Sequence, residues 1–269
     1  MPNQYPNGIG GTLGNSLVTC RPLSISGAVW YVSSATGTDA GGTAGRNREK
    51  PLASVSQAIT NSSEGDIIVF LSDHDQTISG PININKQLTL VGEGSVAGVP
   101  EATFRSSANQ ILFDAQVAGT QFINIKFEES TAVNTASRIE IGNTDIYLDQ
   151  IYMECGANDA HGVRATITGS RLTIRNSTFI STSTDIADQP GIAVSLEASG
   201  LADMRLEGVT FSAGTVGFAN YFAFSAQNAI ERFVGQDISL LLGADMKLNE
   251  STTGRLNLQT VTGGSRVEW

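Results

Sequence analysis

The sequence predicts an all-β chain that winds into a parallel solenoid, and three observations predict this fold class. A short phrase of alternating apolar residues around one turn residue occurs seven times between residues 88 and 263. Because side chains alternate along a strand, the successive phrases align into inward and outward columns. Glycine is abundant, with 29 in 269 residues, and only 16% of the residues are charged. Short stacked strands joined by small-residue turns are expected to have this composition.

The phrases repeat at intervals that indicate one coil of chain with loops of variable length. Successive turn residues lie 32, 26, 26, 32, 29 and 23 residues apart. The turn residues are Gly92, Asn124, Gln150, Asn176, Gly208, Asp237 and Thr260. We expect the three amides of this column to stack and to hydrogen-bond to one another along the solenoid axis.

The columns predict which side chains form the core. The residues two before the turn residue are expected to point inward, and they are Leu90, Phe122, Leu148, Ile174, Leu206, Gly235 and Leu258. The residues three after it are also expected inside, and they are Ser95, Phe127, Met153, Phe179, Phe211, Leu240 and Gly263. The residues just before it are expected outside, and they are Val91, Ile123, Asp149, Arg175, Glu207, Gln236 and Gln259. A shift of one residue would expose the whole core to water, so the columns define the register.

The outward column predicts a ladder of alternating charge on three successive coils, formed by Asp149, Arg175 and Glu207. A further strand is expected upstream of the phrases, at residues 111–113, 139–141, 192–196 and 221–224. Each coil therefore contributes several short strands.

Residues 1–28 are rich in Gly, Asn, Pro and Ser, and their apolar residues follow no sustained period. We expect an extended N-terminal arm, which either wraps its own solenoid or docks onto neighbouring subunits, because such a segment needs contacts to become ordered. The arm residues expected to bind a partner are Tyr5, Ile9, Leu13, Leu17 and Val18.

Residues 29–95 are expected to form the entry to a single solenoid domain at 29–269, with the remaining coils at 96–269. A strand is expected at 29–32, a turn-rich loop at 37–42 and a fully apolar strand at 67–71. Between them, a helix is expected to start at Pro51 and to place Leu52, Val55, Ala58 and Ile59 on one face. Such a helix would cover the open edge of the first coil.

The entry region contains, in this order, YVS at 31–33, GTD at 37–39, KPLASVSQAI at 50–59, GDIIV at 65–69 and ININKQLTLVG at 82–92. These segments resemble the opening block of right-handed parallel β-helix proteins of the pectin-lyase-like superfamily. It is specific over residues 30–95 and generic over the later coils. It implies coils of three parallel strands, a right-handed turn and a capping helix. It implies no single activity, because the superfamily includes polysaccharide lyases, glycoside hydrolases, phage tailspikes and non-enzymatic surface proteins.

Composition argues against several classes of partner. The net charge is −10 and the isoelectric point is about 4.6, so we expect no nucleic-acid partner, which would need a basic face. No apolar run approaches the length of a membrane span, and residues 1–6 lack the basic and apolar parts of a secretory signal. The two cysteines, Cys20 and Cys155, form no disulfide framework, which favours folding in a reducing cytoplasm.

The sequence matches known catalytic motifs only weakly. Polygalacturonase-like proteins have Asn-Thr-Asp, an Asp pair, Gly-His-Gly and Arg-Ile-Lys on successive coils; this chain has only NTD at 143–145, AHG at 160–162 and, before both, RIE at 138–140. Glycan cleavage needs two carboxylates across the bond, and lyases of this fold typically use an acid-bound calcium and an arginine base. If a glycan site exists, we expect it among Asp145, Asp149, Glu154, Asp159, His161 and Arg175.

We expect no metal site and no cofactor. Residues 73–75, Asp-His-Asp, are interpreted as a solvated turn, since no further ligands can be named. By elimination and analogy, the sequence favours a non-enzymatic structural protein of a virus particle, such as a phage capsid decoration or cement protein. Its expected partners are other virion proteins or copies of itself, in a homo-oligomer or lattice. The expected location is the virion, assembled in the host cytoplasm. The alternative is a β-helix protein that binds or degrades polysaccharide, such as a tailspike.

Overall fold

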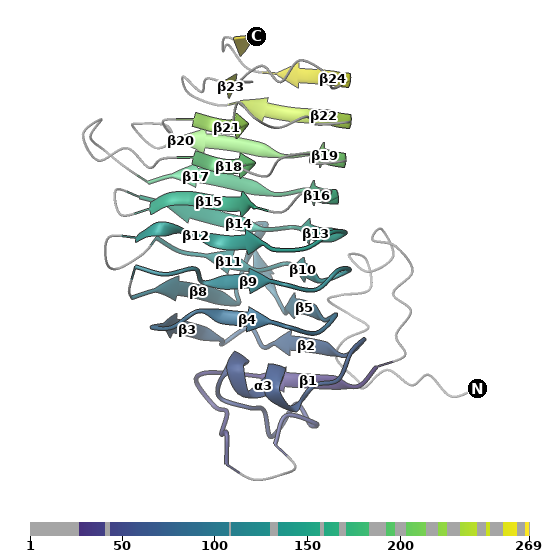
Figure 1. Cartoon of the computed structure of the whole chain (residues 1–269). Coiled ribbons are helices and arrows are strands. Elements are labelled where there is room, and N and C mark those ends of the chain that lie inside the picture. The colour runs from purple at the N-terminus through teal and green to yellow at the C-terminus, as the bar shows by residue number, and fades with distance from the viewer. Residues whose placement is uncertain are drawn as a thin grey trace.

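The computed structural model describes residues 27–40, 44–107, 109–129, 134–156, 159–166, 171–182, 192–196, 203–213, 220–224, 232–240, 246–247, 255–262 and 267–268. These residues form long parallel β-sheets and one helix, in agreement with the predicted all-β class. The strands stack one above another from β1 toward the C-terminal end (Figure 1). No helix in the described part of the chain is long and apolar enough to cross a membrane.

The largest sheet has 15 strands arranged in two rows, which meet at β22. The first row consists of β1 (Val29–Val32), β2 (Ile67–Phe70), β5 (Thr89–Gly92), β10 (Gln121–Ile123), β13 (Ile146–Asp149), β16 (Arg171–Arg175), β19 (Asp203–Glu207), β22 (Arg232–Leu240) and β24 (Arg255–Thr262). The second row consists of β3 (Asp75–Ile78), β8 (Thr103–Ser106), β11 (Lys126–Phe127), β14 (Tyr152–Cys155), β17 (Thr178–Ser181) and β20 (Thr210–Ala213), and it also ends on β22. The long strand β22 joins the rows because it pairs with both β19 and β20.

A separate sheet of six strands contains the third strand of each pass of the chain. Its members are β4 (Ile82–Ile84), β9 (Phe113–Ala115), β12 (Asn134–Ile141), β15 (Asp159–Ala165), β18 (Ile192–Leu196) and β21 (Asn220–Phe224). The upstream strands expected from the sequence are found here, although β9 begins at Phe113 rather than at residue 111. Two smaller pairs complete the structure: β23 (Met246–Lys247) with β25 (Val267–Glu268), and the antiparallel hairpin of β6 (Ser95–Val96) and β7 (Val99–Pro100).

The strand register confirms the alignment of all seven members of the first inward column. Phe122 pairs with both Leu90 and Leu148, and the pairing continues through Ile174, Leu206, Gly235 and Leu258. All five members of this column from β5 to β19 are fully buried. The same pairs confirm the alignment of the outward column, because its members are the next residues along each strand.

The second inward column aligns as predicted from Phe127 to Leu240, but the prediction of Ser95 is wrong. Ser95 is exposed in the β6–β7 hairpin, and Phe104 of β8 pairs with Phe127 instead. The hairpin is an insertion between the two halves of one phrase, so the inward residue comes nine positions later in the chain. Gly263 lies outside the described residues.

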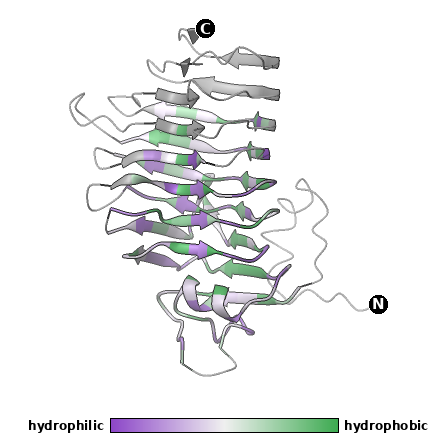
Figure 2. Ribbon diagram, in the orientation of Figure 1, coloured by the Kyte–Doolittle hydropathy of each residue, from purple (hydrophilic) through white to green (hydrophobic). Residues whose placement is uncertain are grey.

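The core consists of apolar side chains from all three sets of strands, with aromatic rings in mutual contact. The Phe104 ring centroid lies 5.1 Å from that of Phe113, and the Phe113 centroid lies 5.6 Å from that of Phe122, both in edge-to-face geometry. Edge-to-face pairs add to the stabilisation from burial alone. Figure 2 shows that β2 is hydrophobic along its whole length, unlike the more mixed strands above it.

The turn column owes its composition to backbone conformation. Asn124, Gln150, Asn176 and Gly208 all have positive φ, between 45° and 59°. Asn and Gly adopt this left-handed conformation more readily than other residues. The predicted ladder of amides bonded to one another is wrong: the Asn124 amide donates to the carbonyl oxygens of Gly92 and Gly94, and the Asn176 amide donates to Asp149.

The single described helix, α3 (Val55–Asn61), lies beside β1 at the N-terminal end of the stack (Figure 1). The expected start at Pro51 is wrong, because Leu52 pairs with Val32 as a bridge and Ser54 caps the helix through its hydroxyl. The Asp39 carboxylate accepts the backbone N–H groups of Ala53 and Ser54. Three side chains of the predicted face, Val55, Ala58 and Ile59, are buried as expected.

Candidate functional site

The residues predicted for a glycan site lie on different sheets. Asp149 and Arg175 are paired neighbours in the first row, at the ends of β13 and β16. Glu154 belongs to β14 of the second row. Asp159 and His161 belong to β15 of the six-stranded sheet, and the Asp159 side chain lies outside the described residues. The structure therefore brings only part of the predicted set together.

The first-row residues form a hydrogen-bonded group on the outward face. The Tyr147 hydroxyl donates to Asp149 Oδ2 at 3.3 Å, and the Asn176 amide donates to Asp149 Oδ1 at 2.9 Å. Arg175 Nη1 donates to the Tyr147 hydroxyl at 3.1 Å. Although it faces away from the core, Asp149 is only 1% exposed. Both of its oxygens thus already have partners within the protein, which fits a structural carboxylate.

The predicted alternation of charge in this column is confirmed by an ion pair. Arg175 Nε lies 2.7 Å from Glu207 Oε2, and Arg205 also contacts Glu207. Burial lowers the pKa of Arg175, but the hydrogen bond with Tyr147 and the nearby Glu207 and Asp149 outweigh it and leave this pKa above its usual value. A raised pKa favours the charged form of the guanidinium, and this form has no lone pair with which to accept a proton.

Asp145 lies just before β13, with φ of 59°. Its Oδ2 is 2.6 Å from Nη2 of Arg171 on the next strand of the row. Exposed pairs of this kind contribute little to stability. The contact nevertheless occupies a carboxylate that the NTD motif had suggested for catalysis.

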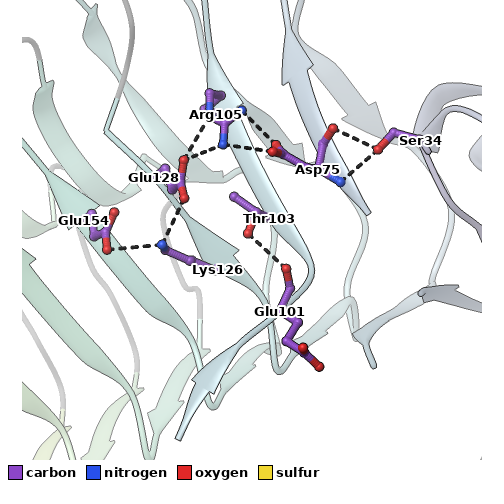
Figure 3. A network of polar contacts seen from close by, with 8 residues as sticks. All are labelled: Ser34, Asp75, Glu101, Thr103, Arg105, Lys126, Glu128 and Glu154. Atoms are coloured by element: carbon purple, nitrogen blue, oxygen red, sulfur yellow. Dashed lines mark hydrogen bonds and ion pairs between the residues drawn. The ribbon is translucent and has the colours of Figure 1, made fainter. Parts of the chain in front are cut away.

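A second network covers the outward face of the second row (Figure 3). Arg105 on β8 lies between two acids: its Nη1 is 2.8 Å from Asp75 Oδ1 and its Nε is 2.9 Å from Glu128 Oε2. Lys126 Nζ is 2.9 Å from Glu128 Oε1 and 3.3 Å from Glu154 Oε1. The backbone of Asp75 also joins this network, since its N–H donates to the Ser34 hydroxyl and its carbonyl oxygen accepts from it.

The charges in this network hold one another in the ionised state. Burial raises the pKa of Glu128, but the hydrogen bonds from Lys126 and Arg105 outweigh it, so the pKa lies below its ordinary value. Burial lowers the pKa of Lys126, but Glu128 and Glu154 outweigh it and raise this pKa. A general acid needs a raised carboxyl pKa, so Glu128 is tuned away from that role.

Sequence reasoning missed this network, although a signal was available. Lys126 lies two positions after its turn residue, and Glu128 and Glu154 lie four positions after theirs. These are outward positions of the same phrase. Arg105 could not be aligned in this way, because the β6–β7 hairpin displaces β8 from the phrase that begins at residue 88.

The interpretation of residues 73–75 as a solvated turn is wrong for His74. Its side chain is fully buried between aromatic rings, with centroids 5.2 Å from Phe70 and 4.9 Å from Phe104. Nδ1 accepts the backbone N–H of Ser34 at 3.1 Å, and within the described residues Nε2 has no hydrogen-bond partner. Burial lowers the pKa of His74 to about 4, so the ring is neutral at pH 7. Asp73 and Asp75 are exposed, but only Asp73 lies in a turn, because Asp75 is the first residue of β3.

Among the described residues, no group of three or more His, Cys, Asp or Glu side chains is arranged to hold a metal ion. Cys155 is buried in β14. Cys20 and the arm residues Tyr5, Ile9, Leu13, Leu17 and Val18 lie outside the described part of the chain.

In comparisons with family models, curated proteins and solved structures, no match to this chain was found.

Proposed function

We propose that this chain is a right-handed parallel β-helix that serves as a non-enzymatic structural protein of a virus particle, of the capsid decoration or accessory type. The observation that best supports a structural role is the pairing of charges on the outward faces. Glu128 and Glu207 each form an ion pair with a side chain of another strand in the same row, and Asp149 accepts a hydrogen bond from Asn176, which directly follows the next strand. Carboxylates used in this way reinforce the stack of passes.

The β-helix assignment is supported by the order in which strands pair. From β2 to β21, each pass adds one strand to the first row, one to the second and one to the six-stranded sheet, always in parallel. A chain that repeats this path is a stack in which each pass contacts its neighbours, so it makes a stiff rod. The right-handed turn, and the relation to pectin-lyase-like proteins, are inferred from the sequence of residues 30–95.

The placement on a virus particle rests on elimination and on the analogy with tailspikes. In this proposal the N-terminal arm attaches the rod to other virion proteins or to copies of itself. Tyr5, Ile9, Leu13, Leu17 and Val18 supply the apolar contacts, because apolar side chains in a polar, glycine-rich segment gain most from burial against a partner.

Polysaccharide binding is the rival function, and aromatic side chains spaced along one outward face would favour it. Among the described outward tyrosines, Tyr31 on the first row is buried, and the partly exposed ones are Tyr147 on the first row and Tyr152 on the second. Tyr152 already has Lys126 Nζ 5.9 Å from its ring centroid. Two tyrosines on different rows form no common stacking platform, so this arrangement supports the structural role more than a glycan site.

The proposal is tested by sedimentation of the purified chain with virus particles from the same source. A matched variant changes Ile9, Leu13 and Leu17 to Ser, and its solenoid is compared with that of the parent by thermal melting. We expect the parent to sediment with the particles and the variant to stay in solution with an unchanged melting temperature. If the parent stays in solution, or if the variant binds as well as the parent, the proposed attachment is wrong.

A further inference from the structure

The first row has an apolar surface on the side that faces away from the core. We call it the outer stripe, and its members are Tyr31, Ile67, Val69, Leu71, Val91 and Ile123. These side chains form a cluster separate from the main core, which contains the alternate residues of the same strands, such as Ile68 and Leu90. The stripe ends where the outward column changes to Asp149, Arg175 and Glu207.

The outer stripe is shielded from water. Val69 and Val91 are each 1% exposed, and Ile123 is fully buried. An outward side chain on a sheet face remains in contact with solvent unless another segment covers it. Farther along the same column, Asp149 is buried beside its hydrogen-bonded neighbours Tyr147 and Asn176, and Arg175 and Glu207 are only partly buried.

Within the described residues, the cover of the stripe is only partly accounted for. The cluster takes its apolar members from β1, β2, β5 and β10 and from Leu71, which follows β2. Near β1, the ion pair of Arg48 and Glu93 lies close to Tyr31, and burial raises the pKa of this tyrosine. Val91 and Ile123 are farther along the row.

The chain enters the structure at the edge of this stripe. The Ala28 N–H donates to Asp66 Oδ1 at 2.6 Å, and the Ala28 carbonyl accepts the N–H of Ile67 at 2.9 Å. The indole N–H of Trp30 donates to the other oxygen of Asp66 at 2.9 Å. Val29 then packs against the stripe itself. These bonds fix where the preceding segment must start.

The preceding segment has the length and the pattern to cover the stripe. From β1 to β10 the row extends over three strand spacings, or about 14 Å. The eight residues 19–26 span up to about 26 Å when extended. Leu23 and Ile25 alternate with serines, so both can face the same side of an extended strand.

We propose that residues 19–26 of the same chain dock on the outer stripe and bury Leu23 and Ile25 against Val91 and Ile123. Residues 1–18 then start from a fixed point on the side of the rod. The assignment of those residues to a virion partner rests on the proposed function, whereas the docking of residues 19–26 does not. The stripe is therefore an anchor for the arm, and the attachment residues lie beyond it.

In the full chain, the reaction rate of a thiol at position 91 measures how well the outer stripe is covered. The reporter protein has Val91→Cys, which removes little volume, and Cys20→Ser, which removes the competing thiol. Cys155 remains as an internal standard, because it is 1% exposed and faces the core. The rate of reaction with an aromatic disulfide reagent is measured for each thiol.

Two matched double variants separate the two parts of the arm. Leu23→Glu with Ile25→Glu should increase the reaction rate at position 91 about tenfold or more, because it removes the apolar contact that closes the stripe. Leu13→Glu with Leu17→Glu should leave that rate unchanged. Cys155 should stay slow in both. If Cys155 also reacts in the first variant, the measurement is repeated with the milder pair Leu23→Ser and Ile25→Ser in place of the two glutamates.

Three results would overturn the proposal. An unchanged rate at position 91 in the Leu23 and Ile25 variants would mean that another segment covers the stripe. An equal increase in the Leu13 and Leu17 variant would mean that the cover is not confined to residues 19–26. Protection that disappears on dilution of the reporter protein would assign the cover to a second copy of the chain. None of these results depends on binding to virus particles, so the failure of either proposal is recognised separately.

Discussion

Phe179 stacks on Phe211 inside the second row, with ring centroids 5.4 Å apart and planes inclined by 23°. The two residues are paired neighbours on β17 and β20, and both are fully buried. Because each ring is held between the passes above and below, the space left by a smaller side chain cannot collapse without moving the strands.

We therefore expect Phe179→Ala to lower the free energy of unfolding by about 3–5 kcal/mol. The measurement is urea denaturation followed by circular dichroism. Thr178→Ala, at the outward neighbouring position, is the control and should change the stability by less than about 0.5 kcal/mol. A loss below about 1 kcal/mol for Phe179→Ala would contradict the tight packing of this column.

Gly208 occupies the turn column with φ of 59°, where an added Cβ would lie 3.1 Å from Asn176 Oδ1. We expect Gly208→Ala to cost about 1 kcal/mol, because alanine is strained in the left-handed region and the contact is tight. Gly80→Ala is the matched control, since its Cβ would meet no atom within 4 Å. Equal denaturation midpoints for the two variants would show that the turn conformation is unstrained.

The inward columns could be predicted because each pass repeats the same local pattern, and a period of two leaves only one register that buries Phe122, Leu148 and Ile174 together. The prediction that Ser95 points inward was wrong because the inserted β6–β7 hairpin interrupts its phrase. The alternation of apolar residues does not reveal such a short insertion. The prediction for His74 was wrong for another reason. A histidine between two aspartates is typical of an exposed turn, but this ring is buried by its contacts with Phe70 and with Phe104 of the next pass.

The candidate site was harder to predict than the fold. Asp149, Glu154 and Asp159 lie within eleven residues of one another, yet each belongs to a different row or sheet. The proximity of these acids in the sequence therefore suggested a cluster that the folded chain does not form. Two of these acids have partners from other passes, namely Asn176 for Asp149 and Lys126 for Glu154. Only the register between passes identifies such pairs.

We expect the purified chain to release no reducing ends and no unsaturated sugars from pectin, alginate or bacterial capsule. The physical reason is that Asp149 already accepts hydrogen bonds from Tyr147 and Asn176, and Asp145 is paired with Arg171. Asp149→Asn should instead lower the stability by about 1–3 kcal/mol, since it changes a buried acceptor. Turnover by the parent that disappears in Asp145→Asn or Asp149→Asn would establish an enzyme.

His74 should make the stability depend on pH between about 4 and 6.5. Its pKa is lowered from 6.5 to about 4 by burial, although Asp73 and Asp75 act in the opposite direction. In this window the unfolded chain binds more protons than the folded chain, so the free energy of unfolding rises with pH. The contribution is complete above pH 6.5, is lost as the pH falls toward 4, and amounts to roughly 3 kcal/mol.

The matched variant is His74→Asn, whose side-chain oxygen can still accept the N–H of Ser34 but does not titrate. Denaturation midpoints are measured from pH 4 to pH 7 for both proteins, so that the titration of carboxylates common to both cancels in the difference. We expect the stability of the parent to fall more steeply than that of the variant as the pH decreases. The difference between the two slopes corresponds to the uptake of up to one proton by the parent on unfolding. Parallel curves would mean that His74 becomes protonated in the folded protein as easily as in the unfolded chain, and that the ring is not held in the neutral state between Phe70 and Phe104.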